Sequence, residues 1–215
     1  VIEKPLVTNV EQYLGFSNQI SKSLNPRFYS CFHKRYSELH EMFKKDFGIT
    51  KKPIDMHCIV YEIPLPIHHW YNWPNSGSRL ISNGCHWLDY FMFLNDFSKV
   101  VDMKKWIPRG EDIIVQVKLE NNAFLSLSLT DSGSQRLGVR DYIELRSEDK
   151  TYKMIDSEYY QAEDRRRVFS KCRVNPLRAY SRMYSKISEN IAENGSGDSI
   201  KTLRSTKLML DLENI

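Results

Sequence analysis

The sequence predicts an α+β domain: an open, predominantly antiparallel β-sheet that helices cover on one face. The first part of the chain alternates helix-spaced apolar residues with short strand-like runs. From about residue 113 the apolar residues instead occupy every second position, as in half-buried strands. Strands gathered after such a mixed portion are typical of α+β domains, so we expect a single sheet with one covered face.

The first expected helices have recognisable start and stop signals in the sequence. Thr8 and Glu11 are spaced as a capping box, which predicts a helix over residues 8–24. Asn25-Pro26 would end that helix, and a short strand is expected over 28–33. The next expected elements are a helix over 37–47 closed by Gly48, a strand over 54–63, a long aromatic loop and a helix over 85–94.

The sheet is predicted mainly from the alternating segments. Residues 113–119 and 124–130 flank the turn Asn121-Asn122 and indicate an antiparallel hairpin. Further strands are expected over 139–146 and 151–155. The last stretch, 176–215, predicts two helices separated by a glycine- and asparagine-rich turn at 194–197.

Composition bounds the class of protein. The chain has 215 residues, 41% of them hydrophobic, which suits one soluble globular domain. We find no apolar run long enough to span a membrane and no signal-peptide pattern, so a cytoplasmic location is expected. The net charge of +4 is too small to indicate nucleic acid, and the run Arg165-Arg166-Arg167 is interpreted as a solvated surface run rather than a phosphate contact.

The cysteines and histidines do not indicate a metal or a disulfide framework. The four cysteines form no CxxC pair and are expected to be buried free thiols. His68 and His69 are adjacent and would point apart on an extended chain, so no metal site is predicted.

Two polar residues could perform chemistry. Lys4 lies between an apolar start that reads as the tail of a strand and Pro5, where its ammonium could face a developing alkoxide. His86 follows Gly84 on the predicted helix, and Asp89 falls three residues later on the same face. Such a histidine could be a general base, or a partly buried side chain satisfied by the backbone.

Three segments, in order and at their separations, resemble one family. "VIEKPLVTNVEQ", "FHKRYSELHEMFK" and "SGSRLISNGCHWLDYFMFL" are similar to the glucose-fructose oxidoreductase/inositol dehydrogenase/MocA (Gfo/Idh/MocA) family over nearly the whole chain. The resemblance implies a preceding Rossmann domain that binds NAD or NADP, with residues 1–24 as its end and connecting helix. Residues 25–215 would then be the substrate-binding and oligomerisation domain with its C-terminal helices.

The resemblance also implies roles for single residues. Lys4 matches the lysine beside the nicotinamide and the substrate hydroxyl, with Pro5 next to the cofactor, and His86 matches the acid/base of hydride transfer. Asp89 matches an acidic position that could orient His86, cap or pack, and Arg35 matches an arginine expected to pack or contact substrate.

One position departs from the family pattern. Four residues before the histidine the family often has Asp, whereas this chain has Ser82, followed by Asn83. These two side chains could contact a different substrate through hydrogen bonds, the proton path could differ, or the protein could be a noncatalytic binding module. Trp70 and Trp73 in the aromatic loop could stack on a sugar or simply anchor the loop.

We therefore expect the C-terminal part of an NAD(P)-dependent oxidoreductase that acts on a sugar, nucleotide sugar or polyol and is inactive as this fragment. The alternatives are a sugar-binding regulatory module and a structural dimerisation module of the same fold. NAD or NADP is expected in the complete protein and no cofactor on this fragment. The expected partners are the sugar substrate and a second copy of the chain through the sheet face, without nucleic acid or membrane.

Overall fold

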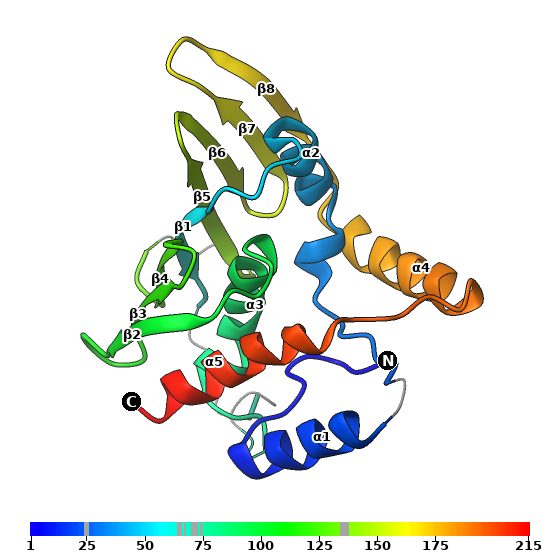
Figure 1. Cartoon of the computed structure of the whole chain (residues 1–215). Coiled ribbons are helices and arrows are strands. Elements are labelled where there is room, and N and C mark those ends of the chain that lie inside the picture. The colour runs from blue at the N-terminus through cyan, green and yellow to red at the C-terminus, as the bar shows by residue number, and fades with distance from the viewer. Residues whose placement is uncertain (24–25, 64–65, 67, 70–72, 74, 134–137) are drawn as a thin grey trace.

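An eight-stranded sheet with helices on one face forms the body of the molecule (Figure 1). The computed structural model describes residues 1–23, 26–63, 66, 68–69, 73, 75–133 and 138–215. The strands are β1 Asp55–Tyr61, β2 Val100–Trp106, β3 Ile113–Leu119, β4 Phe124–Thr130, β5 Arg140–Ser147, β6 Lys150–Ile155, β7 Tyr159–Glu163 and β8 Val168–Arg173. Their order is β2-β3-β4-β1-β5-β6-β7-β8; β1 runs parallel to β4, and the remaining neighbours are antiparallel.

The alternation of apolar and polar residues along the strands decides which face of the sheet the helices cover. On β4, Leu125, Leu127 and Leu129 are fully buried, and Ser126 and Ser128 between them face the other side. The same period buries alternate residues of β3, so the predicted hairpin is confirmed. Each leucine buried in this way stabilises the fold by about 1.5–3 kcal/mol.

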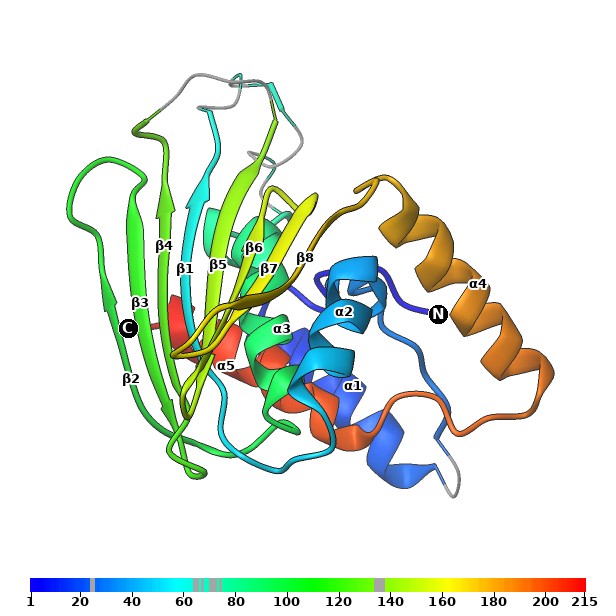
Figure 2. The same ribbon diagram turned by 90° about the horizontal axis from the view of Figure 1, so that it is seen from above.

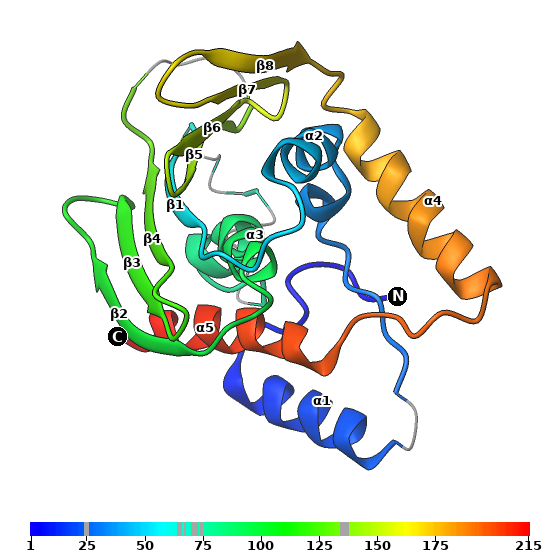
Figure 3. The ribbon, with the colours of Figure 1, turned by 45° about the horizontal axis from the view of Figure 1, so that its top comes forward.

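The helices pack on the face that carries these leucines. They are α1 Val10–Lys22, α2 Glu38–Phe47, α3 Cys85–Leu94, α4 Arg178–Ala192 and α5 Leu203–Glu213, with 3₁₀ turns η1 His33–Tyr36 and η4 Ile200–Thr202 and a π-helical turn η3 Leu80–Gly84. Seen from above, α2, α3 and α5 lie on the same side of the sheet, with α1 and α4 farther out (Figure 2). Figure 3 shows the other face of the sheet without a helix.

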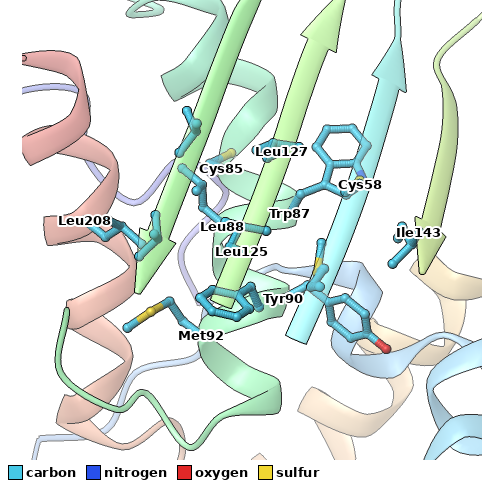
Figure 4. Packing of buried hydrophobic residues seen from close by; sticks show 14 of the residues in the cluster. Cys58, Cys85, Trp87, Leu88, Tyr90, Met92, Leu125, Leu127, Ile143 and Leu208 are labelled. Atoms are coloured by element: carbon cyan, nitrogen blue, oxygen red, sulfur yellow. The ribbon is translucent and has the colours of Figure 1, made fainter. Parts of the chain in front are cut away.

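Helix α3 is the centre of the core. Eight of its ten residues are buried, because it lies between the sheet and α5. Figure 4 shows Leu88 and Met92 of α3 among the side chains of β4 and α5, including Leu125 and Leu208. An element packed on two sides is held in place, so a functional group on α3 has a fixed position.

Most predicted elements are confirmed, and the differences have physical causes. The helix over 37–47 is confirmed as α2, with the Ser37 hydroxyl accepting from the His40 backbone N–H and Gly48 at φ 79° as its end. The capping-box prediction is wrong, because Asn9 caps α1 and Thr8 instead bonds the side chain of Gln12.

The strand predicted over 28–33 is reduced to a single bridge. Ser30 pairs with Ile2, and the chain turns into η1 at His33 because the N-terminal segment offers only one pairing residue. Strands β2, β7 and β8 were not predicted, because long charged residues mask their alternation. Arg165–Arg167 form the exposed turn between β7 and β8, as expected for a surface run.

Two further observations concern the described residues. The four cysteines are free; three are buried and Cys172 is half-buried, which confirms the expected thiol usage. Within the described ranges no helix combines the length and apolar character needed to cross a bilayer.

Candidate active site

The N-terminal segment brings Lys4 to the start of α3. Ile2 is held between two backbone partners: its N–H donates to the carbonyl of Tyr29, and its carbonyl accepts from the N–H of Cys31. Two residues later, the Nζ of Lys4 donates to the backbone carbonyl oxygen of Ser82 at 2.9 Å. This hydrogen bond joins two residues that lie 78 positions apart in the sequence, and Ser82 lies four residues before His86. The sequence predicts Lys4 and His86 as one site, and in the structure Lys4 contacts the turn that precedes His86.

A π-helical turn presents His86. Turn η3 ends at Gly84, where a Cβ atom would lie 2.9 Å from Leu80 Cδ1 and 3.1 Å from Leu129 Cδ1. Both leucines are fully buried and have little room to move, so glycine is required for the turn to lie against β4. Single π turns occur frequently at functional sites, because they re-aim the side chains that follow.

The imidazole of His86 is buried among other rings. His86 is 6% exposed, and its Nδ1 has no hydrogen-bond partner among the described residues. The ring of His33 lies 4.6 Å away, centroid to centroid, at 72°, and Phe32 and Trp87 also meet it edge to face. A buried polar atom without a partner is uncommon and is a candidate contact for a ligand or water.

The surroundings keep His86 neutral. Burial is the main cause that holds the pKa of His86 well below its ordinary value. His33, Lys4 and Lys34 lower the pKa further, because a positive charge nearby disfavours a protonated imidazole. A neutral imidazole has a free lone pair and can accept a proton.

His33 extends the site toward α4. Its ring stacks on Tyr180 of α4 at 4.5 Å and 20°, while its other side meets His86. The Nδ1 of His33 is also buried without a partner in the described part of the chain. Burial and the charge of Lys34 lower the pKa of His33 to about 3, so this imidazole is neutral as well.

A pocket adjoins His33. It has a volume of about 330 Å³, including its opening to solvent, and Lys34, Asp141, Ser157 and Tyr90 are among its lining residues. The Nζ of Lys34 forms an ion pair with Asp141, and the indole N–H of Trp87 donates to the same carboxylate oxygen at 3.0 Å. Asp141 therefore fixes the lysine beside the two imidazoles.

Arg35 and Asp89 bind each other, which favours the packing alternative that the sequence left open for both residues. Arg35 Nε donates to Asp89 at 2.7 Å, Nη2 donates to the second carboxylate oxygen, and Ser205 Oγ donates to Asp89 at 2.8 Å. Both charged side chains are at most 3% exposed. Burial alone would lower the pKa of Arg35, but the carboxylate of Asp89 outweighs it and raises that pKa. The pair joins η1 to α3 and is a packing contact.

The remaining residues that the sequence proposed for substrate or cofactor binding have different surroundings. The hydroxyl of Ser82 is buried and has no hydrogen-bond partner among the residues that the structure describes, and its backbone carbonyl, not its side chain, meets Lys4. Asn83 is buried and donates from Nδ2 to Glu62 at 2.8 Å, so its amide is engaged by the protein. Trp73 is 58% exposed, and Trp70 lies outside the described residues. Pro5 lines a second, small pocket together with Phe32.

Sequence reasoning missed four members of this region. His33, Lys34, Asp141 and Tyr180 come from η1, β5 and α4, and no spacing in the sequence connects them. Only the basic run His33-Lys34-Arg35, at the end of the strand predicted over 28–33, could have indicated His33 and Lys34.

Comparisons with known proteins identify the fold. No sequence profile of a known family and no curated sequence matches the chain. Among solved structures, UDP-N-acetylglucosamine 3-dehydrogenase GnnA from Acidithiobacillus ferrooxidans matches with a TM-score of 0.77 at 13% identity, covering 99% of this chain and 68% of that one. A Gfo/Idh/MocA family oxidoreductase from Vibrio cholerae matches with a TM-score of 0.69 at 13% identity, over 97% of this chain and 66% of that one. The chain has the Gfo/Idh/MocA fold.

A third match has the same extent. The dehydrogenase MviM from Clostridium difficile gives a TM-score of 0.70 at 15% identity, over 99% of this chain and 69% of that one. The Gfo/Idh/MocA fold of this chain thus corresponds to about two thirds of each neighbour. The fold predicted by the resemblance is confirmed, and identities this low establish the fold without the reaction.

Proposed function

We propose that this chain is the substrate-binding part of an NAD(P)-dependent oxidoreductase that acts on a sugar, nucleotide sugar or polyol by hydride transfer. The observation that carries the proposal is the meeting of Lys4 with the turn that presents His86. Lys4 and His86, the two residues most strongly expected to carry out the chemistry, are far apart in sequence, yet Lys4 contacts the turn before His86 and its charge acts on that imidazole.

The geometry supports a division of roles. His86 is neutral and buried, so it can accept the proton of a substrate hydroxyl. The ammonium of Lys4 is anchored to a backbone carbonyl beside it and would stabilise the oxygen as negative charge develops there. The charge of Lys34, fixed by Asp141, adds to the same positive field.

The residues present fit the reacting end of a cofactor rather than a whole dinucleotide. The neutral imidazole of His86 and the ammonium of Lys4 suit a carbinol beside a nicotinamide. The sequence contains no G-x-G-x-x-G turn to hold a pyrophosphate. NAD or NADP, when bound by the complete protein, would supply the hydride acceptor.

A sugar-type substrate suits the walls of the site. Aromatic rings can stack on a sugar, and His33 and Tyr180 present stacked rings next to His86. Lys4 and Lys34 would favour an anionic sugar, such as one joined to a nucleotide. GnnA, a protein of the same fold, is a UDP-N-acetylglucosamine dehydrogenase, and this is consistent with the proposed class.

A noncatalytic sugar-binding module is the second candidate. Its support is Ser82, which occupies the position where the family often has Asp, and no carboxylate contributes to the pKa shift of His86. Turnover by the complete protein would exclude this candidate.

We also propose that two copies associate through the uncovered face of the sheet. Ile59 of β1 is 54% exposed there and is paired with Tyr142 of β5, which is 37% exposed. Sheet faces of this kind are often buried in homodimers. Sedimentation of a monomer at all micromolar concentrations would contradict this part of the proposal.

The experiment is an assay of the complete protein with NAD and NADP against a panel of sugars, polyols and nucleotide sugars. We expect reduction of one dinucleotide by at least one compound, with turnover lost and dinucleotide binding kept in His86→Asn. A complete protein that binds neither dinucleotide would overturn the proposal.

A further inference from the structure

The imidazole rings of His33 and His86 lie against each other, and each ring has a buried nitrogen that forms no hydrogen bond in the described part of the chain. His33 and His86 are in ring contact at 4.6 Å, and the Nδ1 atom of each is buried without a hydrogen bond among the described residues. Packing alone would be served by phenylalanine at either position. A buried nitrogen without a hydrogen-bond partner has lost its contact with water without a replacement, which destabilises the fold and indicates a use for it.

The proton taken up by His86 also needs a route out. His86 is 6% exposed, and Asp89, its nearest acidic residue in sequence, is bound to Arg35 and Ser205. The neutral hydroxyl of Ser82 cannot stabilise the positive charge of an imidazolium as a carboxylate would. Lys4 and Lys34 disfavour a positive charge on His86, so a proton that remained there would oppose the reaction.

We propose that His33 relays the substrate proton from His86 to solvent, through a water between the two Nδ1 atoms. This inference rests on the proposed function. His33 is less deeply buried than His86 and lies under Tyr180 at the edge of α4, so it connects the buried ring to the outside.

The relay balances at each atom. When bound, NAD or NADP would accept the carbinol C–H electron pair as hydride, and the hydroxyl proton would bond to Nε2 of His86. The proton on His86 Nδ1 leaves to the water, which gives one of its protons to Nδ1 of His33. His33 releases its Nε2 proton to solvent. Each imidazole gains and loses one proton, so no imidazolium persists beside Lys4 and Lys34, and proton exchange with water restores the starting tautomers.

Other charged groups around the pair fit this path. Asp141 faces His33 from β5, and it favours a proton there, whereas it is not among the groups that shift the pKa of His86. A proton is therefore relatively better accommodated on His33 than on His86. Lys34 acts on both rings and opposes a charge on either.

The test uses His33→Phe, which keeps a ring against Tyr180 and His86 but cannot carry a proton. In the complete protein we expect kcat to fall by about 100-fold, within the usual range for lost proton transfer, with KM nearly unchanged. We also expect a larger solvent isotope effect and partial rescue by added imidazole. His57→Gln, on the uncovered face of the sheet, is the matched control and should leave kcat unchanged.

A second measurement separates the relay from the proposed reaction. In the 215-residue chain, nitrogen-15 NMR should show that His33→Phe changes the tautomer of His86, whereas His57→Gln does not. If the complete protein lacks turnover altogether, the proposed function fails and the NMR result alone decides whether the rings are coupled. Full turnover in His33→Phe, or an unchanged His86 tautomer in that folded variant, overturns the relay.

Discussion

The ammonium of Lys4 donates a hydrogen bond to the backbone carbonyl oxygen of Ser82 at 2.9 Å. This contact joins the N-terminal segment to the π turn that begins the central helix. It also places a positive charge close enough to His86 to lower the pKa of that imidazole. One lysine therefore anchors a segment and adds to the effect of burial, which is the main cause of the low pKa of His86.

Replacing Lys4 should change His86 before it changes the fold. In Lys4→Met the nearby charge is lost, so the pKa of His86 should rise toward its ordinary value while burial still keeps it low. NMR titration of the histidines measures this directly, and turnover of the complete protein should fall by about 100-fold or more. Lys44→Met on α2, whose ammonium is exposed, is the control. An unchanged His86 titration in Lys4→Met would contradict this electrostatic role.

The glycine of the π turn should be far more sensitive than a surface glycine. In Gly84→Ala the new methyl group would press on Leu80 and Leu129, and we expect a loss of about 1–3 kcal/mol in the free energy of unfolding. Gly15→Ala in α1 meets no atom within 4 Å and should be neutral or stabilising by up to about 1 kcal/mol. Urea unfolding of both variants tests the difference; equal effects would mean that the turn adapts freely.

The buried pair of Arg35 and Asp89 should be a strong stability determinant. Asp89→Leu removes the nearer carboxylate and leaves the buried guanidinium of Arg35 with the longer pair to Asp198 at 3.4 Å, so unfolding should become easier by about 3 kcal/mol. Lys52→Gln breaks a pair whose side chains are 51% and 58% exposed, and it should cost less than about 1 kcal/mol. If Asp89→Leu unfolds at the same urea concentration as the parent, the structural role assigned to this pair is wrong.

Acid should destabilise the domain through its buried histidines. Burial lowers the pKa of His40 to about 4 and that of His33 to about 3 in the folded protein. In the unfolded chain each titrates near about 6.5, so below that pH the unfolded state binds more protons. The free energy of unfolding should be insensitive to these groups above about pH 7 and fall by about 1 kcal/mol per pH unit for each histidine from about pH 6 toward pH 4.

The check is urea unfolding at several pH values for the parent and for His40→Gln. The variant lacks one of the titrating groups and should show a shallower fall between about pH 6 and about pH 4. Parallel curves for the two proteins would rule out His40 as a source of the acid sensitivity.

The sequence predicts a helix or strand correctly where one local pattern of apolar residues dominates. The prediction fails where pairing with a distant segment determines the structure. Helix α3 and the β3–β4 hairpin were predicted closely because the apolar period reports their buried faces. Strand β8 was missed because its charged side chains face solvent at the edge of the sheet and its pairing with β7 is not a local property.

The site shows the same division. Lys4 and His86 were proposed from their local sequence, and the resemblance implied their roles because its motifs are present in the chain. The partners of Asp89 could not be found in this way, because helix spacing placed its carboxylate near His86 but tertiary packing brought Arg35 and Ser205 to it. His33 became a candidate site residue only in the folded structure, because its ring contacts both His86 of α3 and Tyr180 of α4.

The most direct test of the account is a comparison of the complete protein with its His86→Asn variant, measuring both dinucleotide binding and nicotinamide reduction. We predict that both proteins bind NAD or NADP with similar affinity and that only the parent reduces it in the presence of a sugar-type substrate. Undiminished reduction by His86→Asn, or no dinucleotide binding by the parent, would contradict the central claim that Lys4 and His86 form the hydride-transfer site of an oxidoreductase.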